Sequence, residues 1–443
     1  MPPAMIVLVL LVAKLRGLCG ALGWRVLVLL AALLPGPEAC AQPSQPFQLA
    51  RPRARRAVLK FDMHRNLIIV AARLNGLGPY HFLLDTGVAT SLITNPALAD
   101  SLHLTLGEEL RVVGAGGEDT PLRAYRTNAL RVELPGVVAP SMSWLILSDD
   151  ALNLSGYAGT RIDGILGSEF FRSLTVAIWP QRGQLVCHAP DRYRPPRRWA
   201  SLPLLLAQGK PYLEAGVEQL PAATEATPAA APLPLRLLLD TGAGHALSLE
   251  TTADRRLHLP AAHLRADLGR GLSGTITGYL GRVGAVRLGR YRLGQVLTSF
   301  PDSGQVHQRL RQQDAQRQGN LGYEALKRFN LVIDYPHQRL LLRPNGQYRQ
   351  PFEHDMSGLD LLAAGPGLRH CLITGVAAGS PAAAAGILPD DELLAINALP
   401  AAVLSLSEIA RLLRAQDGQR LHLVLRRADG ELLAVSLQLR RQI

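Results

Sequence analysis

The sequence predicts a mostly β protein made of two similar lobes, followed by a small α/β module. The tripeptide Asp-Thr-Gly occurs twice, starting at Asp85 and Asp240, and each copy follows an apolar run typical of a buried strand. The spacing from each aspartate to a later glycine is the same in both halves. Beyond residue 350 the pattern changes to short strands alternating with two helices.

The two halves are related by a constant offset of 155 positions (240 − 85). Each aspartate lies 82 residues before a glycine, Gly167 in the first half and Gly322 in the second. Residues 171–178 and 326–333 continue the offset, and both predict a short helical turn followed by a strand. A register kept over about 80 residues indicates a duplicated structural unit rather than a chance match of tripeptides.

Residues 1–41 predict an export signal that is cleaved after Ala41. Two apolar runs, 6–12 and 26–34, are flanked by basic residues, and small residues precede the cleavage point. Each run is roughly half as long as a membrane-spanning helix requires. We therefore expect an exported protein, periplasmic or secreted. The alternative is that the runs remain as an imperfect envelope anchor; a lipid anchor on Cys40 agrees less well with the preceding Pro37-Glu38-Ala39.

The composition argues against two classes of function. Among 443 residues the net charge is +12, but the arginines are scattered and only 5% of residues are aromatic, unlike a nucleic-acid-binding face. The 4 cysteines have neither the spacing of a disulfide framework nor that of metal ligands, so no metal or cofactor is expected. Abundant Leu, Ala and Arg with rare Lys are typical of a GC-rich bacterial source.

The first lobe is expected over residues 57–190. Residues 67–74 predict a strand that turns at 75–79 and returns through 82–84 to the first aspartate. Further strands are expected at 110–113, 130–134 and 144–147, with a glycine cluster at 114–117.

The second lobe is expected over residues 200–343. A strand at 212–217 leads into an Ala- and Pro-rich connection at 221–234, which is expected to be the mobile loop of an extended hairpin and not a domain boundary. Strands are expected at 281–288 and 295–300, with a second glycine cluster at 271–274.

The two aspartates would face each other if a pseudo-twofold axis relates the lobes. Facing carboxylates cannot both ionise cheaply, so they share a proton. The ionised member can take a proton from water while the protonated member polarises an amide carbonyl, and the pair titrates as a unit. Gly87 and Gly242 would allow close approach, and Thr86 and Thr241 could hydrogen-bond across the lobes. For a single copy, a turn in which Asp caps its own backbone is the alternative.

Residues 57–343 resemble the aspartic peptidases of the pepsin and retroviral-protease group. Each half has the apolar-apolar-Asp-Thr-Gly motif, a glycine-rich stretch and a later apolar-Gly segment, here Ile165-Leu166-Gly167 and Asn320-Leu321-Gly322. The resemblance implies a two-lobed acid-protease β-barrel fold with Asp85 and Asp240 as the catalytic dyad. It further implies support of that dyad by Thr86, Gly87, Thr241 and Gly242, and flaps that contain Gly116, Gly117, Ser273 and Gly274.

The sequence departs from the group's pattern at several positions. Val88 follows the first tripeptide where Ser, Thr or Ala is usual, whereas Ala243 follows the second. Asn320 replaces an apolar residue, and the flap tyrosine of pepsins has only a distant candidate in Tyr279. His245, five residues after Asp240, is interpreted as a satisfied surface or interface side chain rather than a residue lining the site. The pattern is nearer the retroviral and bacterial type.

A linker at 350–355 leads to a module at 354–443. Strands are expected at 371–376, 393–397, 421–426 and 431–439, a short helix after Gly379-Ser380-Pro381, and an amphipathic helix over 407–414 capped by Ser405 or Ser407. The segments Gly-Ser-Pro-Ala-x-x-Ala-Gly and Asp-Asp-Glu-Leu-Leu-Ala-Ile-Asn resemble bacterial PDZ domains of the circularly permuted type.

PDZ domains bind extended peptides by adding a strand to a sheet edge. The resemblance places the peptide-binding loop at Gly358, Leu359, Asp360 and Leu361. An inward-pointing Asp360 would disfavour a carboxylate and favour internal or extended segments. The alternative is a module that only packs against the peptidase.

The sequence thus predicts an exported bacterial aspartic endopeptidase, a hydrolase whose PDZ domain recruits or gates polypeptide substrates. Its expected partners are such substrates and a peptide in the PDZ groove, with no nucleic acid and no membrane contact except through an uncleaved N-terminal segment. One alternative is a catalytically impaired peptide-binding protein of the cell envelope. Another is a structural envelope protein held by its N-terminal segment.

Overall fold

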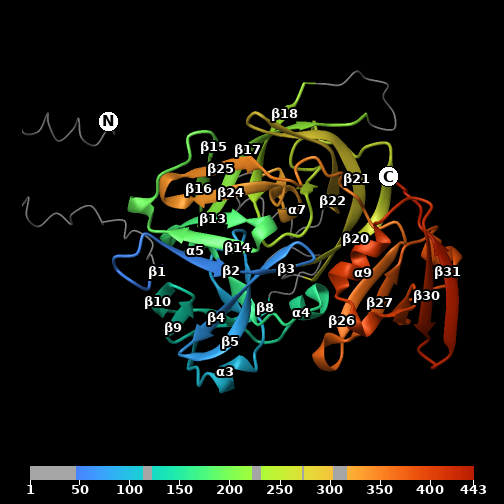
Figure 1. Ribbon diagram of the computed structural model, residues 1–443, viewed down its shortest axis with the longest axis horizontal. Helices are drawn as coiled ribbons and strands as arrows, with labels where there is room; N and C mark the ends of the chain where they lie inside the picture. Colours follow the sequence, from blue (N-terminus) through green and yellow to red (C-terminus); the bar gives the residue numbers. More distant parts are fainter. Residues whose placement is uncertain (1–45, 113–121, 222–230, 272–273, 303–316) are drawn as a thin grey trace, which may run out of the picture. The chain divides into compact units, whose positions relative to one another are not determined.

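The computed structural model describes residues 46–112, 122–221, 231–271, 274–302 and 317–443. The expected export signal, the flap positions Gly116, Gly117 and Ser273, and most of the 221–234 connection lie outside these residues. The described part is mostly β, as predicted, and its strands form four sheets (Figure 1). Within the described ranges, no helix is long and apolar enough to cross a membrane.

The first lobe is one sheet with short connecting helices. Its strands are β1 (Gln48–Leu49), β3 (Asp62–His64), β4 (Leu67–Leu74), β5 (Leu77–Leu84), β6 (Leu92–Ile93), β7 (Leu106–Val112), β8 (Leu122–Thr127), β9 (Leu130–Leu134), β10 (Val137–Met142), β11 (Leu145–Leu147) and β12 (Gly164–Leu166). They run in the order β1-β10-β9-β4-β5-β12-β6-β11-β8-β7, with β3 beside β4. The helices are α3 (Leu98–Ser101), α4 (Leu154–Ala158) and α5 (Ser168–Ser173). Pairing of β1 with β10 places the start of the lobe before residue 57.

The second lobe repeats this plan. Its elements are β16 (Leu205–Ala207), β17 (Lys210–Glu218), β18 (Leu233–Leu239), β19 (Leu247–Leu249), β20 (His263–Gly271), β21 (Gly274–Leu288), β22 (Tyr291–Pro301), β23 (Gly319–Leu321) and the helix α7 (Tyr323–Leu326). The order is β16-β17-β18-β23-β19-β22-β21-β20, and β17 also pairs with β21. Because β17 and β18 are antiparallel partners, the 221–234 connection joins two strands of a hairpin, as predicted.

A third sheet joins the two lobes. It contains β2 (Arg56–Lys60), β13 (Thr175–Trp179), β14 (Gln184–His188), β15 (Ala200–Pro203), β24 (Phe329–Asp334) and β25 (Arg339–Pro344), in the order β15-β25-β24-β13-β14-β2. Three 3-10 turns flank these strands, η2 (Pro180–Arg182), η3 (Pro190–Arg192) and η4 (Tyr335–His337). In the central pair, Ala177 lies opposite Val332, and these residues are 155 positions apart (332 − 177). The pseudo-twofold axis of the duplication therefore passes through this pair.

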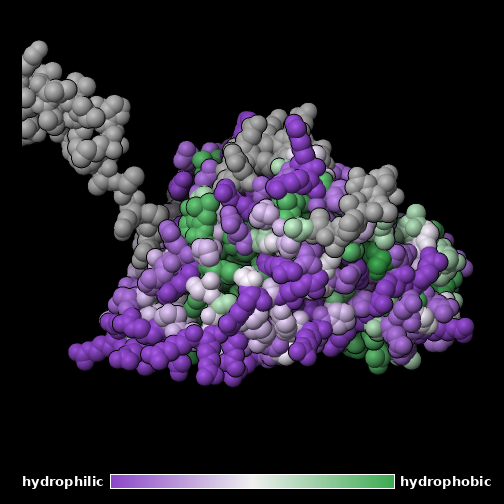
Figure 2. Space-filling model, turned by 90° about the horizontal axis from the view of Figure 1, so that it is seen from above, coloured by the Kyte–Doolittle hydropathy of each residue, from purple (hydrophilic) through white to green (hydrophobic). Residues whose placement is uncertain are grey.

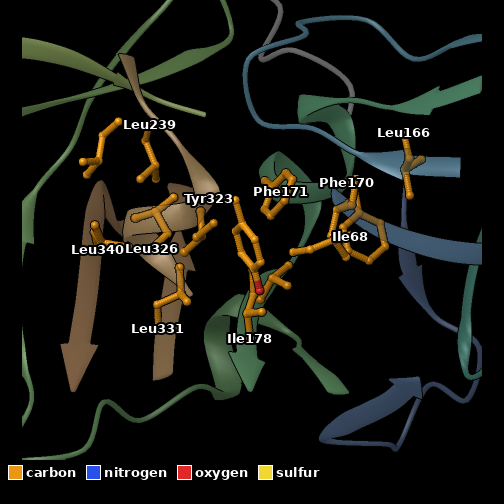
Figure 3. Close-up of a cluster of buried hydrophobic side chains, with 14 of the residues drawn as sticks. Ile68, Leu166, Phe170, Phe171, Ile178, Leu239, Tyr323, Leu326, Leu331 and Leu340 are labelled. Atoms are coloured by element: carbon orange, nitrogen blue, oxygen red, sulfur yellow. The ribbon is translucent and has the colours of Figure 1, made fainter. Parts of the chain in front are cut away.

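Apolar side chains from both lobes form one continuous core (Figure 3). Phe170 and Phe171 on α5 and Ile178 on β13 contribute from the first lobe, and Tyr323 and Leu326 on α7 from the second. All five are fully buried. Truncating such side chains typically costs about 2–5 kcal/mol each, so this shared core holds the two lobes in register.

The C-terminal module is a separate small sheet with its own core. Its strands are β26 (Leu359–Ala364), β27 (His370–Val376), β28 (Glu392–Ile396), β29 (Leu399–Pro400), β30 (Arg420–Arg426) and β31 (Leu432–Gln438). They run in the order β26-β27-β28-β30-β31, with β29 beside β28. The helical segments are η5 (Pro366–Leu368), α8 (Pro381–Ala384), η6 (Ala401–Val403) and α9 (Leu406–Leu413).

Two details of this module refine the sequence predictions. Ser405, and not Ser407, caps α9, because its Oγ accepts from the Glu408 N–H while the Glu408 carboxylate accepts from the Ser405 N–H. Of the four positions expected in the peptide-binding loop, only Gly358 precedes the strand, with a φ of +81°. The next three, 359–361, are already the first residues of β26.

Hydrophilic side chains dominate one face of the molecule. Figure 2 shows hydrophilic residues over most of the visible face, with small hydrophobic patches between them. This distribution agrees with the scattered arginines of the sequence.

Candidate active site

Asp85 and Asp240 directly follow β5 and β18, at equivalent points of the two lobes. β5 pairs in parallel with β12, and β18 pairs in parallel with β23. The Asp85 N–H donates to the Leu166 carbonyl and the Asp240 N–H to the Leu321 carbonyl, each at 3.0 Å. The same backbone bond therefore fixes both aspartates at the end of a buried strand.

The glycines after the aspartates bring the two carboxylates together. A Cβ atom on Gly242 would lie only 2.2 Å from Cγ of Asp85, and one on Gly87 would lie 3.1 Å from Cγ of Asp240. The Gly87 N–H donates to Asp85 Oδ1 at 2.6 Å, and the Gly242 N–H donates to Asp240 Oδ1 at 3.1 Å. At Gly242 there is no room for a side chain beside the opposite carboxylate, and at Gly87 there is little.

The two threonines form a reciprocal set of hydrogen bonds between the lobes. The Thr86 N–H donates to Oγ1 of Thr241 at 3.1 Å, and the Thr241 N–H donates to Oγ1 of Thr86 at 3.0 Å. Each hydroxyl then donates across the axis, that of Thr86 to the Leu239 carbonyl at 2.5 Å and that of Thr241 to the Leu84 carbonyl at 2.8 Å. Both threonines are fully buried, so these bonds fix the position of one aspartate against the other.

The pKa of Asp85 is raised from its usual 3.8 to about 8. Burial is the main cause, and the negative charge of Asp240 adds to it, while the Gly87 N–H acts in the opposite direction. The pair consequently keeps one proton through neutral pH, as general acid–base chemistry by two carboxylates requires.

The raised pKa of Asp85 also predicts a pH-dependent stability. Between pH 3.8 and about 8 the folded protein holds a proton that the unfolded chain has lost. The stabilisation from this group is therefore complete below pH 3.8 and is lost as the pH rises through about 8. The asparagine in Asp85→Asn cannot ionise. In calorimetric scans, the melting temperature of this variant minus that of the wild type should therefore increase as the pH is raised across this range. A difference that stays constant with pH would contradict the shared proton.

Asn320, a departure from the family pattern, makes the two aspartates unequal. Its side-chain amide donates to Oδ2 of Asp240 at 3.1 Å. The equivalent residue of the first lobe is Ile165, which has no hydrogen-bond donor in its side chain. Because a donated N–H favours the charged form of a carboxylate, this contact favours Asp85 as the member of the pair that holds the shared proton. The sequence marks this position as unusual, but the contact depends on the pairing of β18 with β23.

Replacing Asn320 with isoleucine is expected to move the acid limb of the pH–rate profile to higher pH. Without the donated N–H, the charged form of the dyad is less stable and forms only at higher pH. The turnover rate at mildly acidic pH should fall about tenfold, since hydrogen bonds to charged groups contribute about 1.5–3 kcal/mol. Ile165→Val at the equivalent position of the first lobe is the matched control, and it should leave the acid limb in place.

Val88 and Ala243 make equivalent backbone hydrogen bonds in the two lobes. The Val88 carbonyl accepts from the Ser168 N–H at 2.9 Å, and the Ala243 carbonyl accepts from the Tyr323 N–H at 2.8 Å. The Val88 side chain packs on an apolar cluster of the first lobe. The Ser168 hydroxyl in addition donates to the Thr86 carbonyl at 3.2 Å, a contact that the sequence does not predict.

The His245 side chain is affected by its position near Asp240. Burial lowers the pKa of His245, against the opposing charge of Asp240, and its buried Nε2 has no hydrogen-bond partner among the described residues. The interpretation of a satisfied side chain is therefore not supported.

Tyr279 lies on β21, where its ring packs edge-on against His263 and carries the Arg265 guanidinium over its face. The flap position Gly274 begins β21 with a φ of +93°.

Two family models match parts of the chain. Residues 70–170 and 232–325 match a family model described as aspartyl protease, and residues 372–427 match one described as PDZ domain. The first two stretches fall in the two lobes and each contains one Asp-Thr-Gly turn. No curated protein matches the chain.

Two solved structures show weaker similarity. One, described as a photosystem II D1 C-terminal processing protease, is 22% identical over 20% of this chain and 23% of its own, with a TM-score of 0.18. This chain thus spans less than a quarter of that protein's length. Basic 7S globulin from soybean is 10% identical over 67% of this chain and 97% of its own, with a TM-score of 0.38.

Proposed function

Because the chain carries an aspartyl protease domain and a PDZ domain, we propose that it is an exported aspartic endopeptidase that acts on polypeptide substrates. Asp85 and Asp240 are its catalytic dyad. The observation that carries this proposal is the reciprocal bonding of Thr86 and Thr241, which holds one carboxylate from each lobe against the other. The apolar runs of residues 1–41 support export.

The reaction follows from the inequality of the two carboxylates. Ionised Asp240 takes a proton from a water molecule, whose oxygen attacks the carbonyl carbon of the peptide bond. Protonated Asp85 gives its proton to the carbonyl oxygen, so that a tetrahedral diol forms. As the C–N bond breaks, the amine nitrogen receives a proton from the dyad and a hydroxyl of the diol returns one to it. The dyad ends with one proton, as it began.

The surrounding turns keep this geometry during the reaction. The N–H groups of Gly87 and Gly242 donate to Oδ1 of Asp85 and of Asp240 and hold the carboxylates in place. Electrostatic stabilisation of this kind is most effective where the donors are fixed before the reaction begins. The PDZ domain recruits or gates the polypeptide whose peptide bond reaches the dyad.

Digestion of an unfolded protein over a range of pH tests the proposal. Mature protein should cut reduced, carboxymethylated casein at acidic to neutral pH, with activity falling as the pH rises through about 8, where Asp85 loses its proton. Asp85→Asn, purified in parallel, should show no cutting. Absence of cleavage by the wild type at every pH from acid to neutral would overturn the proposal and favour a peptide-binding protein without the chemistry.

A further inference from the structure

The edge of the PDZ sheet at which a peptide would add is β26. β26 and β31 are the two outer strands of this sheet, and β26 follows Gly358 in the expected peptide-binding segment. Beside it lies α9, tied to the start of the segment by a hydrogen bond from the Met356 N–H to the Leu413 carbonyl. Among the described residues, β26 has a strand partner on one side only, the side of β27. A strand-adding peptide would therefore occupy the other side.

That free side is already covered by the first lobe, in part by Arg65. The Arg65 guanidinium donates to the Leu361 carbonyl in β26 at 3.0 Å and to the Tyr157 carbonyl in α4 at 3.2 Å. Its backbone N–H donates to Oγ of Ser407 on α9 at 2.9 Å. One residue of the β3–β4 turn thus contacts both the strand and the helix between which a peptide would lie.

Helix α4 also lies against this edge and against α9. A Cβ atom on Gly156 would lie 2.9 Å from the Ala363 carbonyl oxygen, and one on Gly159, at the end of α4, would lie 2.9 Å from Cγ of Leu406. Leu361 and Ala363 are two positions apart, so their carbonyls point to the same side of β26. Both of these edge carbonyls therefore face the first lobe and not an open groove.

We propose that the first lobe is an internal occupant of the PDZ peptide-binding edge, and that an extended peptide binds there only after Arg65 and α4 have moved away. This inference rests on the peptide-binding part of the proposed function. It defines how that site is regulated: docking of the lobe and binding of a peptide exclude each other.

The same turn also contacts the second catalytic loop. The Asn66 side-chain amide donates to the Gly244 carbonyl at 2.9 Å, and Nζ of Lys327 donates to the Asn66 side-chain oxygen at 2.8 Å. Gly244 lies four residues after Asp240. A peptide that displaces Arg65 from β26 therefore moves a turn that holds the Asp240 loop, which couples the PDZ edge to the catalytic site.

Intramolecular competition sets the size of the effect. The lobe is tethered to the PDZ domain and competes at an effective concentration in the millimolar range. The apparent affinity of an external peptide is therefore reduced in proportion to the fraction of molecules in which the lobe is undocked. Loss of one hydrogen bond from a charged donor changes such an equilibrium by about tenfold or more. Variants that weaken docking should therefore bind a peptide more tightly, by about this factor.

The test uses the full chain with Asp85→Asn, so that no probe is cleaved and the result does not depend on peptidase activity. A display library of random peptides is selected on the Arg65→Ala form of this protein. The selected sequence is synthesised with a fluorescein label, and its affinity is measured by anisotropy. Hydrogen exchange of the β26 amides verifies that the labelled peptide lies on this edge. Arg73→Ala is the matched control, because Arg73 is an exposed arginine of β4 whose guanidinium contacts only the Gly76 carbonyl among the described residues.

We expect Arg65→Ala to bind the peptide about tenfold more tightly than the Asp85→Asn parent, and Arg73→Ala to bind like the parent.

A cysteine pair, Arg65→Cys with Ser407→Cys, locks the docked state when oxidised. Cys19 and Cys40 are replaced by serine to avoid other disulfides. The oxidised form should bind at least about tenfold more weakly than the same protein after reduction. Equal affinity in all forms, with β26 protected, would overturn the proposal. So would failure of Arg65→Ala to select any peptide that protects β26.

Discussion

Replacing either Asp85 or Asp240 with asparagine should lower the turnover of an unfolded protein substrate by at least about 10²–10⁴-fold, the usual contribution of a positioned acid or base. The two carboxylates share one proton, so neither can act as acid or base without the other. The double variant should consequently be no less active than either single variant, because residues that act as a unit give non-additive losses. Initial cleavage rates measured for the three proteins give this comparison.

Asp100→Asn is the matched control for these variants, since Asp100 is an exposed aspartate on α3 of the first lobe. It should retain the wild-type rate. Additive losses, in which the double variant falls by the product of the single effects, would show that the two aspartates act at independent sites.

Gly242→Ala should remove activity almost as completely, although it changes no chemical group. The added Cβ would lie 2.2 Å from both Cγ and Oδ2 of Asp85, a distance at which the carboxylate must move. Gly87→Ala should be milder, because its Cβ would lie 3.1 Å from the nearest atoms of the dyad. Overpacking of this kind usually costs about 1–3 kcal/mol, so Gly242→Ala should also unfold at lower denaturant concentration.

Gly294→Ala separates the local effect from a general loss of glycine. Gly294 lies on β22, and its added Cβ would meet no atom closer than 3.5 Å. This variant should cleave at the wild-type rate and keep the wild-type denaturation midpoint. Unimpaired cleavage by Gly242→Ala would contradict the close contact between the second-lobe turn and the Asp85 carboxylate.

The sequence was sufficient to predict the duplicated architecture, because a duplicated fold repeats its spacing. The offset that relates Asp85 to Asp240 also relates Ala177 to Val332, and these two residues pair at the centre of the sheet between the lobes. The strands around both aspartates followed from their apolar runs. Strands β8 and β10, each second from an end of the first-lobe sheet, were not predicted, since their mixed exposed and buried residues carry weaker periodicity.

The details that make the site specific were not predictable in the same way. Asn320 is recognisable in the sequence as a departure, but only the pairing of β18 with β23 brings its amide to Asp240. The contact of Arg65 with Leu361 spans 296 positions and joins two domains, so no local pattern indicates it. Hydrogen bonds between distant segments depend on the packing of whole domains, which periodicity and spacing do not encode.

Calorimetric titration with pepstatin, a mimic of the tetrahedral intermediate, tests most directly whether the two Asp-Thr-Gly turns form one catalytic site. We expect one inhibitor bound per chain, with affinity at least about tenfold lower in Asp85→Asn and in Asp240→Asn, because each removes one carboxyl group of the dyad that hydrogen-bonds the inhibitor hydroxyl. Two inhibitors per chain, or affinity unchanged in either variant, would contradict a single site built from both lobes.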